Sequence, residues 1–577
     1  MSTRPPTAHV AVLALLLSAC AGATVTAGGD DDTQSALTDS AVTDTGPATG
    51  TTETVPGVEE PELFLGFEPP GGTFTDPVAV ALSSVDGAVI TYTTDGSVPV
   101  PGEDAVYDGL IPIATSTTLR AVASWDGDLT DVTSRSYVQL DASVADFSSN
   151  LPLVVLHSFE SAPTYKTAER TPFTVNILEP GDGGLTEILG DATLSLRGGL
   201  KVRGSSTNGQ PKAHYSLELW GQGIDDDFDA EVLGMPPESD WILHAPLYFD
   251  RALMRNALIY GLSNDVGRYA PRTRYVELYV ADRGEAVTSG DYVGVYVVME
   301  RIKRNPERVA IERLLPEHVS EPEVSGGYIF KRDRTGDGES GFSAGTAGGK
   351  WDFDQPLVWV EPSEDEVVWD QQDWLETYLD GFGAALAGTD GIHPATGEHY
   401  TEWIDQDAWI DHHILNILTM NPDALRLSGY LFKDREDKLH AGPIWDFDRT
   451  MGCESDSRAS DPTHWDASYY TGDTTYMFEH GWYRGLFDDP AFASAYWDRW
   501  RALLDAELSL DNILGTVDAM GTELVDAGPR NFEKWTDYPP RGDGTFAWEV
   551  DYLKDWLTRR HDWIRACLDL PDPERCG

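Results

Sequence analysis

The chain has 577 residues, and its 97 acidic residues outnumber its 41 lysines and arginines, which gives a net charge of −56 at pH 7. This charge excludes a general nucleic-acid-binding protein, because neutralising phosphates needs clustered cations, and it disfavours adhesion to anionic lipid surfaces. With 41% hydrophobic residues and 18 tryptophans, the sequence is that of a folding chain and not of a disordered acidic one. Its length is typical of two to four domains.

The first twenty residues resemble an export signal. Arg4 supplies a positive charge, a short apolar stretch follows over residues 9–17, and the sequence Leu-Ser-Ala-Cys ends at Cys20. Small residues before a cysteine at this place resemble a bacterial lipobox, in which the cysteine thiol receives a diacylglycerol. We therefore expect residues 1–20 to be a lipoprotein signal peptide and Cys20 to be lipidated. The exported protein would then reach the outer membrane or cell surface, with the lipid as its only membrane contact. An ordinary signal peptide that happens to contain a cysteine is the alternative.

The next segments are predicted to be a linker and a small β domain. Residues 21–60 are rich in Ala, Gly, Thr and Asp with almost no aromatic residues, which predicts a disordered acidic linker. Residues 61–142 contain short alternating runs at 78–82, 89–93 and 118–122, separated by turn sequences. Strands at this spacing predict an antiparallel β-sandwich.

This predicted sandwich resembles a known accessory module. Residues 90–99 read Ile-Thr-Tyr-Thr-Thr-Asp-Gly-Ser-Val-Pro, and Tyr107 and the run 119–123 follow. The pattern is similar to the fibronectin-III-like module at the C-terminus of chitobiases and hexosaminidases. The resemblance implies a spacer, with carbohydrate binding as the less favoured alternative.

Residues 150–577 are predicted to form an α+β domain with two lobes. Strand patterns prevail over about 150–335, with one helix near 250–266 whose N-cap Asp250 would fit. From about 370 to 577 apolar residues recur three and four apart, which indicates helices, and the last strong helix is expected from Trp548 to Cys567. A β-rich lobe followed by a helical lobe can build a nucleotide cleft, although many other α+β enzymes share this order. Cys567 and Cys576 could close a small loop, which would leave Cys453 unpaired.

Candidates for phosphate binding lie in the first lobe. Arg203 and Ser205 belong to a loop beside a strand, where backbone N–H groups and hydroxyls suit phosphate oxygens. Lys212 precedes the next strand, and Glu300 ends another, so Glu300 could hold Lys212 towards a phosphate if the two strands are neighbours. A solvated turn lysine and a solvent-exposed edge carboxylate are the alternatives.

The most informative carboxylates flank a predicted hairpin in the second lobe. Asp423 follows a predicted helix, a strand-like run follows at 429–433, and Asp446 and Asp448 alternate with aromatic residues. On a strand, both of the latter carboxylates would share one face and suit Mg²⁺. A loop Asp that accepts a hydroxyl proton, a hairpin and a metal-binding Asp-Phe follow one another in kinases. A buried, hydrogen-bonded Asp network is the alternative. Asp333 begins a run like that of a calcium loop, but Ala344 stands where a Glu is needed.

Together these stretches resemble the spore-coat protein H (CotH) kinase family of atypical protein kinases. Matching blocks begin at Arg203, Asp240, Gly294, Asn421 and Gly442, and they cover nearly all of 150–570. The resemblance implies a bilobal protein-kinase-like domain that transfers phosphate from ATP, with Mg²⁺ or Mn²⁺, to Ser or Thr of a secreted protein. Carried over to this chain, Arg203, Ser205, Lys212 and Glu300 would serve the nucleotide, Asp423 the acceptor hydroxyl, and Asp446 and Asp448 the metal.

One departure leaves a rival hypothesis open. Kinases usually place Asn five residues after the catalytic Asp to hold a second metal, and here that residue is Ser428. A non-catalytic pseudokinase or adhesin-like surface protein is therefore the alternative to a surface-anchored kinase.

Overall fold

The computed structural model describes residues 62–576, apart from residues 160, 166–168, 205–206, 208, 222, 224, 337–339 and 468–474. The predictions for residues 1–60, including Cys20, and for Ser205 therefore lie outside the described residues.

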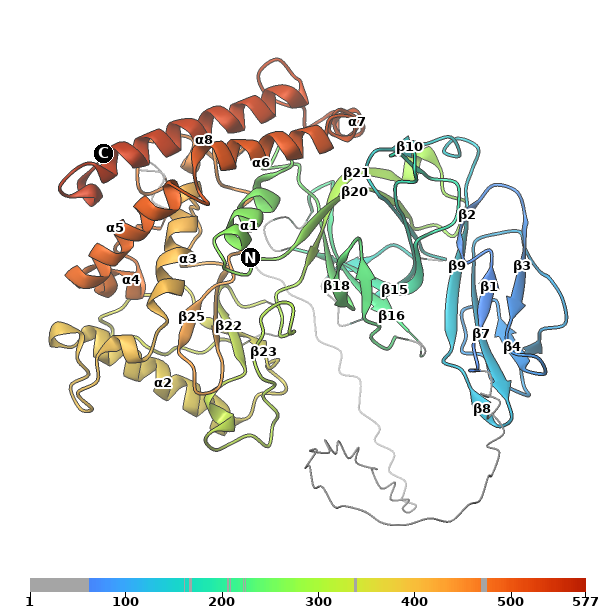
Figure 1. Ribbon diagram of the computed structural model, residues 1–577, viewed down its shortest axis with the longest axis horizontal. Coiled ribbons are helices and arrows are strands. Elements are labelled where there is room, and N and C mark those ends of the chain that lie inside the picture. Colours follow the sequence, from blue (N-terminus) through green and yellow to red (C-terminus); the bar gives the residue numbers. More distant parts are fainter. Residues whose placement is uncertain are drawn as a thin grey trace, which may run out of the picture. The chain divides into compact units, whose positions relative to one another are not determined.

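A β-sandwich opens the described chain, as the alternating pattern predicted (Figure 1). Its two sheets have the strand orders β1-β3-β6 and β2-β9-β7-β4-β5, with β8 paired to β7. Val80, Ile90, Leu119 and Tyr137 lie in the hydrophobic core of the sandwich. The strands are β1 (Gly66–Glu68), β2 (Gly72–Phe74), β3 (Val78–Ser83), β4 (Val89–Thr93), β5 (Ala105–Val106), β6 (Ile111–Ile113), β7 (Thr117–Trp125), β8 (Asp128–Leu129) and β9 (Thr133–Gln139).

The next part of the chain forms a closed β-barrel. An eight-stranded sheet has the order β12-β15-β13-β11-β20-β21-β19-β16, and it closes because β16 also pairs with β15. Alternate residues of β11 pack on opposite faces. Val154 and Leu156 belong to one hydrophobic core, which also contains Trp241. Leu153 and Val155 point the other way and belong to a second apolar cluster. The barrel strands are β11 (Leu153–His157), β12 (Thr164–Tyr165), β13 (Thr171–Leu178), β15 (Leu194–Arg203), β16 (His214–Trp220), β19 (Asp240–His244), β20 (Thr273–Ala281) and β21 (Tyr292–Glu300). The two short pairs are β10 (Ser148–Ser149) with β14 (Thr186–Glu187), and β17 (Ala230–Val232) with β18 (Met235–Glu238).

Helices dominate the rest of the chain and surround a small sheet. The four-stranded sheet has the order β23-β22-β24-β25, formed by β22 (Tyr328–Arg332), β23 (Leu357–Glu361), β24 (Gly429–Lys433) and β25 (Leu439–Ala441). Helices α5, α6 and α8 pack near one another, with α8 against both of the others (Figure 1). The helices are α2 (Trp369–Ala387), α3 (Gln406–Thr419), α4 (Gly481–Phe487), α5 (Pro490–Leu504), α6 (Leu510–Glu523), α7 (Ala527–Lys534) and α8 (Phe546–Leu568). Helix α8 confirms the predicted last helix, and the hairpin of β24 and β25 is also present.

The helix expected near 250–266 is α1 (Arg255–Asp265), and it begins later than the sequence suggested. Its N-cap residue is Met254, so the expectation that Asp250 occupies this position was wrong. The Asp250 carboxylate nevertheless accepts a hydrogen bond of 2.8 Å from the backbone N–H of Arg255. A carboxylate from the preceding turn therefore satisfies one of the first N–H groups of the helix.

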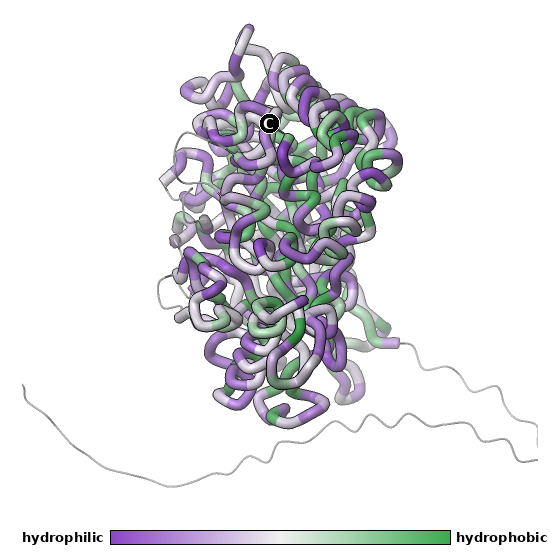
Figure 2. The backbone as a smooth tube through the Cα atoms, turned by 90° about the vertical axis from the view of Figure 1, so that its left-hand side faces the viewer, coloured by the Kyte–Doolittle hydropathy of each residue, from purple (hydrophilic) through white to green (hydrophobic). Residues whose placement is uncertain are grey.

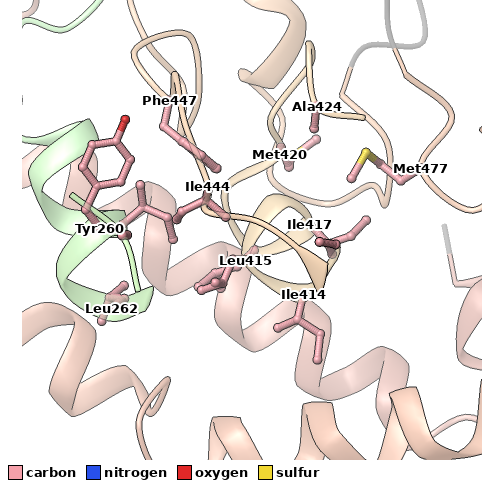
Figure 3. Close-up of a cluster of buried hydrophobic side chains, with 14 of the residues drawn as sticks. Tyr260, Leu262, Ile414, Leu415, Ile417, Met420, Ala424, Ile444, Phe447 and Met477 are labelled. Carbon is pink, nitrogen blue, oxygen red and sulfur yellow. The ribbon is translucent and has the colours of Figure 1, made fainter. Parts of the chain in front are cut away.

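Helix α3 is buried along nearly its whole length and packs against β25. Asp405 caps it by accepting a hydrogen bond of 2.7 Å from the N–H of Ala408. Figure 3 shows the cluster around α3, in which its side chains lie near α1 and the loop that contains Phe447. Phe447 lies 6.4 Å from Tyr260 between ring centroids. This packing holds Phe447, which lies between Asp446 and Asp448 in the sequence.

The described cysteines agree with the predicted small loop. Cys567 and Cys576 form a disulfide with a Cα–Cα distance of 5.4 Å, and the remaining described cysteine, Cys453, is buried with a free thiol.

In Figure 2 hydrophilic segments are frequent along the outer turns, and hydrophobic ones run between them. Within the described ranges, no helix is both long and apolar enough to cross a membrane.

Candidate functional site

A polar cleft of about 370 Å³ brings together residues that lie far apart in the sequence. Arg203 comes from the end of β15, Asp423 from the turn after α3, and Asp446 and Asp448 from the loop after β25, and all four line this cleft. The structure thus gathers four of the residues that the sequence singled out. Ser428, the residue at the usual Asn position, lines the same cleft.

The segment that carries Asp446 and Asp448 is a loop and not the strand that its alternating pattern predicted. Strand β25 ends at Ala441, and Asp446 has a φ of 67°, which a non-glycine residue seldom adopts. Two side chains of α1 hold this backbone. The N–H of Asp446 donates to the Tyr260 hydroxyl at 3.2 Å, and the N–H of Phe447 donates to Asn256 Oδ1 at 2.7 Å. A strained conformation fixed in this way is typical of functional sites.

Arg255 of α1 fixes the far end of the same loop. Its guanidinium is fully buried, pairs with Asp250 at 2.5 Å, and donates to the carbonyl oxygens of Thr450 at 2.9 Å and Met451 at 3.1 Å. The buried ion pair therefore has its remaining donors satisfied by the loop.

Asp446 and Asp448 lie close enough for their carboxylates to repel each other. Burial raises the pKa of Asp446, and repulsion from Asp423 and Asp333 adds to the shift. Burial also raises the pKa of Asp448 well above its usual range, with Asp446 as the next cause. Asp446 is exposed to solvent in the cleft and Asp448 is half-buried, so the protein atoms that line the cleft replace only part of the water around these carboxylates. Carboxylates in this state favour a bound cation.

Asp446 and Asp448 suit a Mg²⁺ ion that has further ligands from water and substrate better than a metal ion whose ligands all come from the protein. Among the residues that the structure describes, no three His, Cys, Asp or Glu side chains converge as ligands. Mg²⁺ commonly binds through one or two carboxylates and takes its other ligands from water and substrate phosphates. The donor set is therefore compatible with Mg²⁺ that arrives with a phosphorylated substrate.

Asp423 is held in place by cations and by its own turn. Its carboxylate contacts Arg426 at 2.8 Å and Arg458 at 3.0 Å, and Arg458 also pairs with Asp456 at 2.7 Å. The N–H of Asp423 donates to Asn421 Oδ1 at 3.1 Å. These contacts fix the orientation of the carboxylate in the cleft.

Arg203 supplies a positive charge to the same cleft, within electrostatic reach of Asp446. Its guanidinium carbon lies 5.6 Å from the centroid of the Trp445 ring. No hydrogen bond or ion pair joins its guanidinium to the described part of the chain, and burial lowers its pKa from the usual arginine value. Such a guanidinium is suited to phosphate oxygens.

The predicted pairing of Lys212 with Glu300 is wrong. Lys212 is 2% exposed, and its amine donates to Pro246 O at 3.1 Å, Val295 O at 2.5 Å and Asn531 Oδ1 at 2.8 Å. Glu300 is fully buried and accepts from Arg272 at 2.6 Å.

The reason is topological, because β19 lies between β16, which follows Lys212, and β21, which ends at Glu300. Neither side chain is among the described residues that line the cleft. The expected contact of both residues with a nucleotide stays a prediction. Lys212 lies instead in a small adjoining pocket that it shares with Asp448.

Sequence reasoning missed several residues that line the cleft. Asp333 was considered only as the start of a calcium loop. Asn256 and Arg458 belonged to segments without a metal or catalytic spacing. The further lining residues include His214, His244, Tyr260, Lys331, Arg334 and Arg449. Only the family blocks gave a signal for any of them, since one block contains Asn256 and another, residues 326–331, contains Lys331.

The fold and the cleft define an α+β domain with a β-barrel half and a helical half, preceded by a β-sandwich. A family model described as CotH kinase protein matches residues 200–564, which is more than half of the chain, and the chain belongs to this family. A second model, described as chitobiase/beta-hexosaminidase C-terminal domain, matches residues 69–134 in the sandwich. None of the curated proteins matches the chain. Both predicted resemblances are confirmed, and the family indicates a kinase-like function. The bilobal kinase-like architecture is supported only as a mixed α/β fold, and the barrel was not anticipated.

Proposed function

We propose that this protein is an exported, surface-anchored atypical kinase that transfers the γ-phosphate of ATP to a Ser or Thr hydroxyl of a protein acceptor. The observation that carries the proposal is one cleft that holds the paired carboxylates Asp446 and Asp448, the fixed carboxylate Asp423 and the guanidinium Arg203.

Each of these residues has a distinct role in the proposed reaction. Asp446 and Asp448 would hold Mg²⁺ or Mn²⁺, which neutralises charge on the phosphate oxygens. Arg203 would bind phosphate oxygens. Asp423 accepts the proton of the acceptor hydroxyl as its oxygen bonds to the γ-phosphorus. The bond from phosphorus to the β–γ bridging oxygen breaks, and ADP leaves.

The supporting residues keep these groups in position. Arg426 and Arg458 orient Asp423, and α1 holds the loop of Asp446 and Asp448 through Asn256 and Tyr260. Enzymes catalyse phosphoryl transfer mostly by positioning the reactants and stabilising charge. The residues of this cleft would supply both.

Thermal melting tests whether the cleft is a nucleotide site. With ATP and Mg²⁺ at about 100 times the dissociation constant, we expect about 2.7 kcal/mol of stabilisation. A chelator should abolish the shift in melting temperature, and adding Mg²⁺ again should restore it. Detection of phosphoserine or phosphothreonine by mass spectrometry would then establish transfer. No shift with a folded protein would contradict the proposal and favour a non-catalytic surface-binding protein.

The proposed anchor is tested separately at Cys20. We expect the mature protein to begin at Cys20 and to carry acyl chains, so that it fractionates with membranes. Intact-mass measurement of the exported protein gives the N-terminus and the lipid mass. Cys20→Ser should move the protein into the soluble fraction. A mature N-terminus elsewhere, without lipid, would contradict the anchor and leave the kinase proposal untouched.

A further inference from the structure

Two buried histidines at the edge of the cleft have no part in the mechanism described above. His214 begins β16 and His244 ends β19, and their ring centroids lie 4.9 Å apart. Both rings line the cleft of Asp446 and also the adjoining pocket that Lys212 shares with Asp448.

The hydrogen bonds around His244 determine which of its nitrogens carries the proton. Asn256 Oδ1 accepts from the N–H of Phe447, so the other atom of that amide, Nδ2, must be the NH₂ group. Asn256 Nδ2 lies 3.1 Å from His244 Nε2. Because Nδ2 can only donate, His244 Nε2 accepts, and in the neutral ring the proton lies on Nδ1.

The same reasoning gives the opposite tautomer for His214. The backbone N–H of Ala245 donates to His214 Nδ1 at 3.2 Å. A backbone amide can only donate here, so Nδ1 accepts and the proton of the neutral ring lies on Nε2.

The environment keeps both rings neutral. Burial lowers the pKa of His214 to about 3, with Arg203 and Lys212 as further causes. Burial also lowers the pKa of His244 well below its usual range, with His214 and the same two cations adding to it. In each ring the lone pair that could coordinate a metal already accepts a hydrogen bond. The rings can therefore offer only an N–H, which suits an anion and not a cation.

Both of these N–H groups are available. No hydrogen bond within the described residues uses His214 Nε2 or His244 Nδ1, and neither atom is among the fully buried polar atoms without a partner. Each N–H therefore has contact with open space, and the cleft and its adjoining pocket are spaces that both rings line.

We propose that His214 Nε2–H and His244 Nδ1–H donate hydrogen bonds to phosphate oxygens of the nucleotide in this cleft. The proposal rests on the proposed kinase function and assigns to the two histidines the contact that the sequence assigned to Lys212. Two neutral donors suit this place because Arg203 and Arg449 line the same cleft and, together with Mg²⁺, would supply the positive charge that the phosphates need. The Lys212 amine keeps its hydrogen bonds to three oxygen acceptors, so its role in this proposal is structural.

Binding of ATP and adenosine, both with Mg²⁺, to matched variants tests the proposal. A hydrogen bond to a charged group contributes enough that His214→Leu and His244→Leu should each weaken ATP binding about 10- to 100-fold. Adenosine lacks phosphates, so its affinity should stay within about 2-fold of that of the unaltered protein. His214→Gln places an amide near the lost Nε2–H, and His244→Asn places one near the lost Nδ1–H. Both should therefore recover most of the ATP affinity.

A spectroscopic measurement checks the tautomers directly. In protein labelled with ¹⁵N-histidine, the resonances of His214 Nε2 and His244 Nδ1 should be those of protonated nitrogens, and these should shift when ATP and Mg²⁺ are added.

The outcomes separate this inference from the proposed function. If the unaltered protein binds no ATP, the proposed function fails. If it binds ATP and the Leu variants bind it equally well, the histidine inference fails. A parallel loss of ATP and adenosine binding would also overturn it, because a purely structural role predicts that result. Should a Leu variant not fold, the Gln and Asn variants and the ¹⁵N spectra still decide.

Discussion

Replacing Asp446 with asparagine is expected to lower the rate of phosphoryl transfer by about 10³-fold or more. The change removes one of the two carboxylates that would hold Mg²⁺, and positioned charges of this kind contribute most of the catalysis in phosphoryl transfer. The assay is transfer of labelled phosphate, with melting temperature measured on the same samples. Asp518→Asn, at an exposed carboxylate that pairs with Lys554, serves as the control and should retain activity.

The same variant should be at least as stable as the unaltered protein when no metal is present. The pKa of Asp446 is raised in the folded state, so stability falls as the pH rises from the unfolded-state pKa through the folded-state pKa, and the penalty is absent only below the unfolded-state pKa. Asparagine has no charge and removes the penalty at neutral pH. Metal should then stabilise the unaltered protein and not the variant. An active Asp446→Asn protein would contradict the assignment of this residue to the metal.

Replacing Asp250 with alanine is expected to destabilise the protein by about 3–5 kcal/mol. Arg255 is fully buried and Asp250 is 2% exposed, so removing the carboxylate leaves an uncompensated charge in the interior. The loss should appear in denaturant unfolding, together with weaker nucleotide binding, because Arg255 also holds the carbonyl oxygens of Thr450 and Met451.

Two further variants show whether the cause is the unpaired charge. Replacing the pair together, as Asp250→Leu with Arg255→Met, should recover part of the stability, because apolar residues of similar volume can substitute for a buried ion pair. Asp498→Asn breaks an exposed ion pair, in which Asp498 is 75% exposed and Arg501 is 46% exposed. This control should lower the free energy of unfolding by less than about 1 kcal/mol. A loss no larger than this for Asp250→Ala would refute the argument.

Local patterns predicted many of the elements and few of their long-range pairings. The alternating runs at 78–82 and 89–93 are strands, and the apolar spacing from Trp548 onward is helix α8. Closure of the barrel depends on hydrogen bonds between β15 and β16 together with a route through five other strands. No local periodicity encodes that arrangement.

Sequence predicted the parts of the site that depend on residue type and order. It did not predict the parts that depend on which residues the fold brings together. Asp423 and Asp446 were found because carboxylates in that order indicate kinase chemistry. The alternation around Asp446 suggested a strand, and the side chains of α1 that impose the left-handed backbone come from a distant segment. The pairing of Lys212 with Glu300 failed for a similar reason, since β19 separates the two strands. The donor histidines could not be found at all, because a tautomer depends on neighbours that only the fold brings together.

The arrangement of the three described cysteines protects the chain from wrong pairing in an oxidising compartment. Cys567 and Cys576 are nine residues apart, so closing the loop between them costs little conformational entropy and does not depend on the fold of the rest of the chain. Cys453 is buried, and burial raises the pKa of its thiol to about 12, so almost no thiolate is available to attack a disulfide. Exchange at Cys453 requires the interior to open. A glutathione adduct or a shuffled bridge at this residue would therefore be a chemical record that the molecule had unfolded.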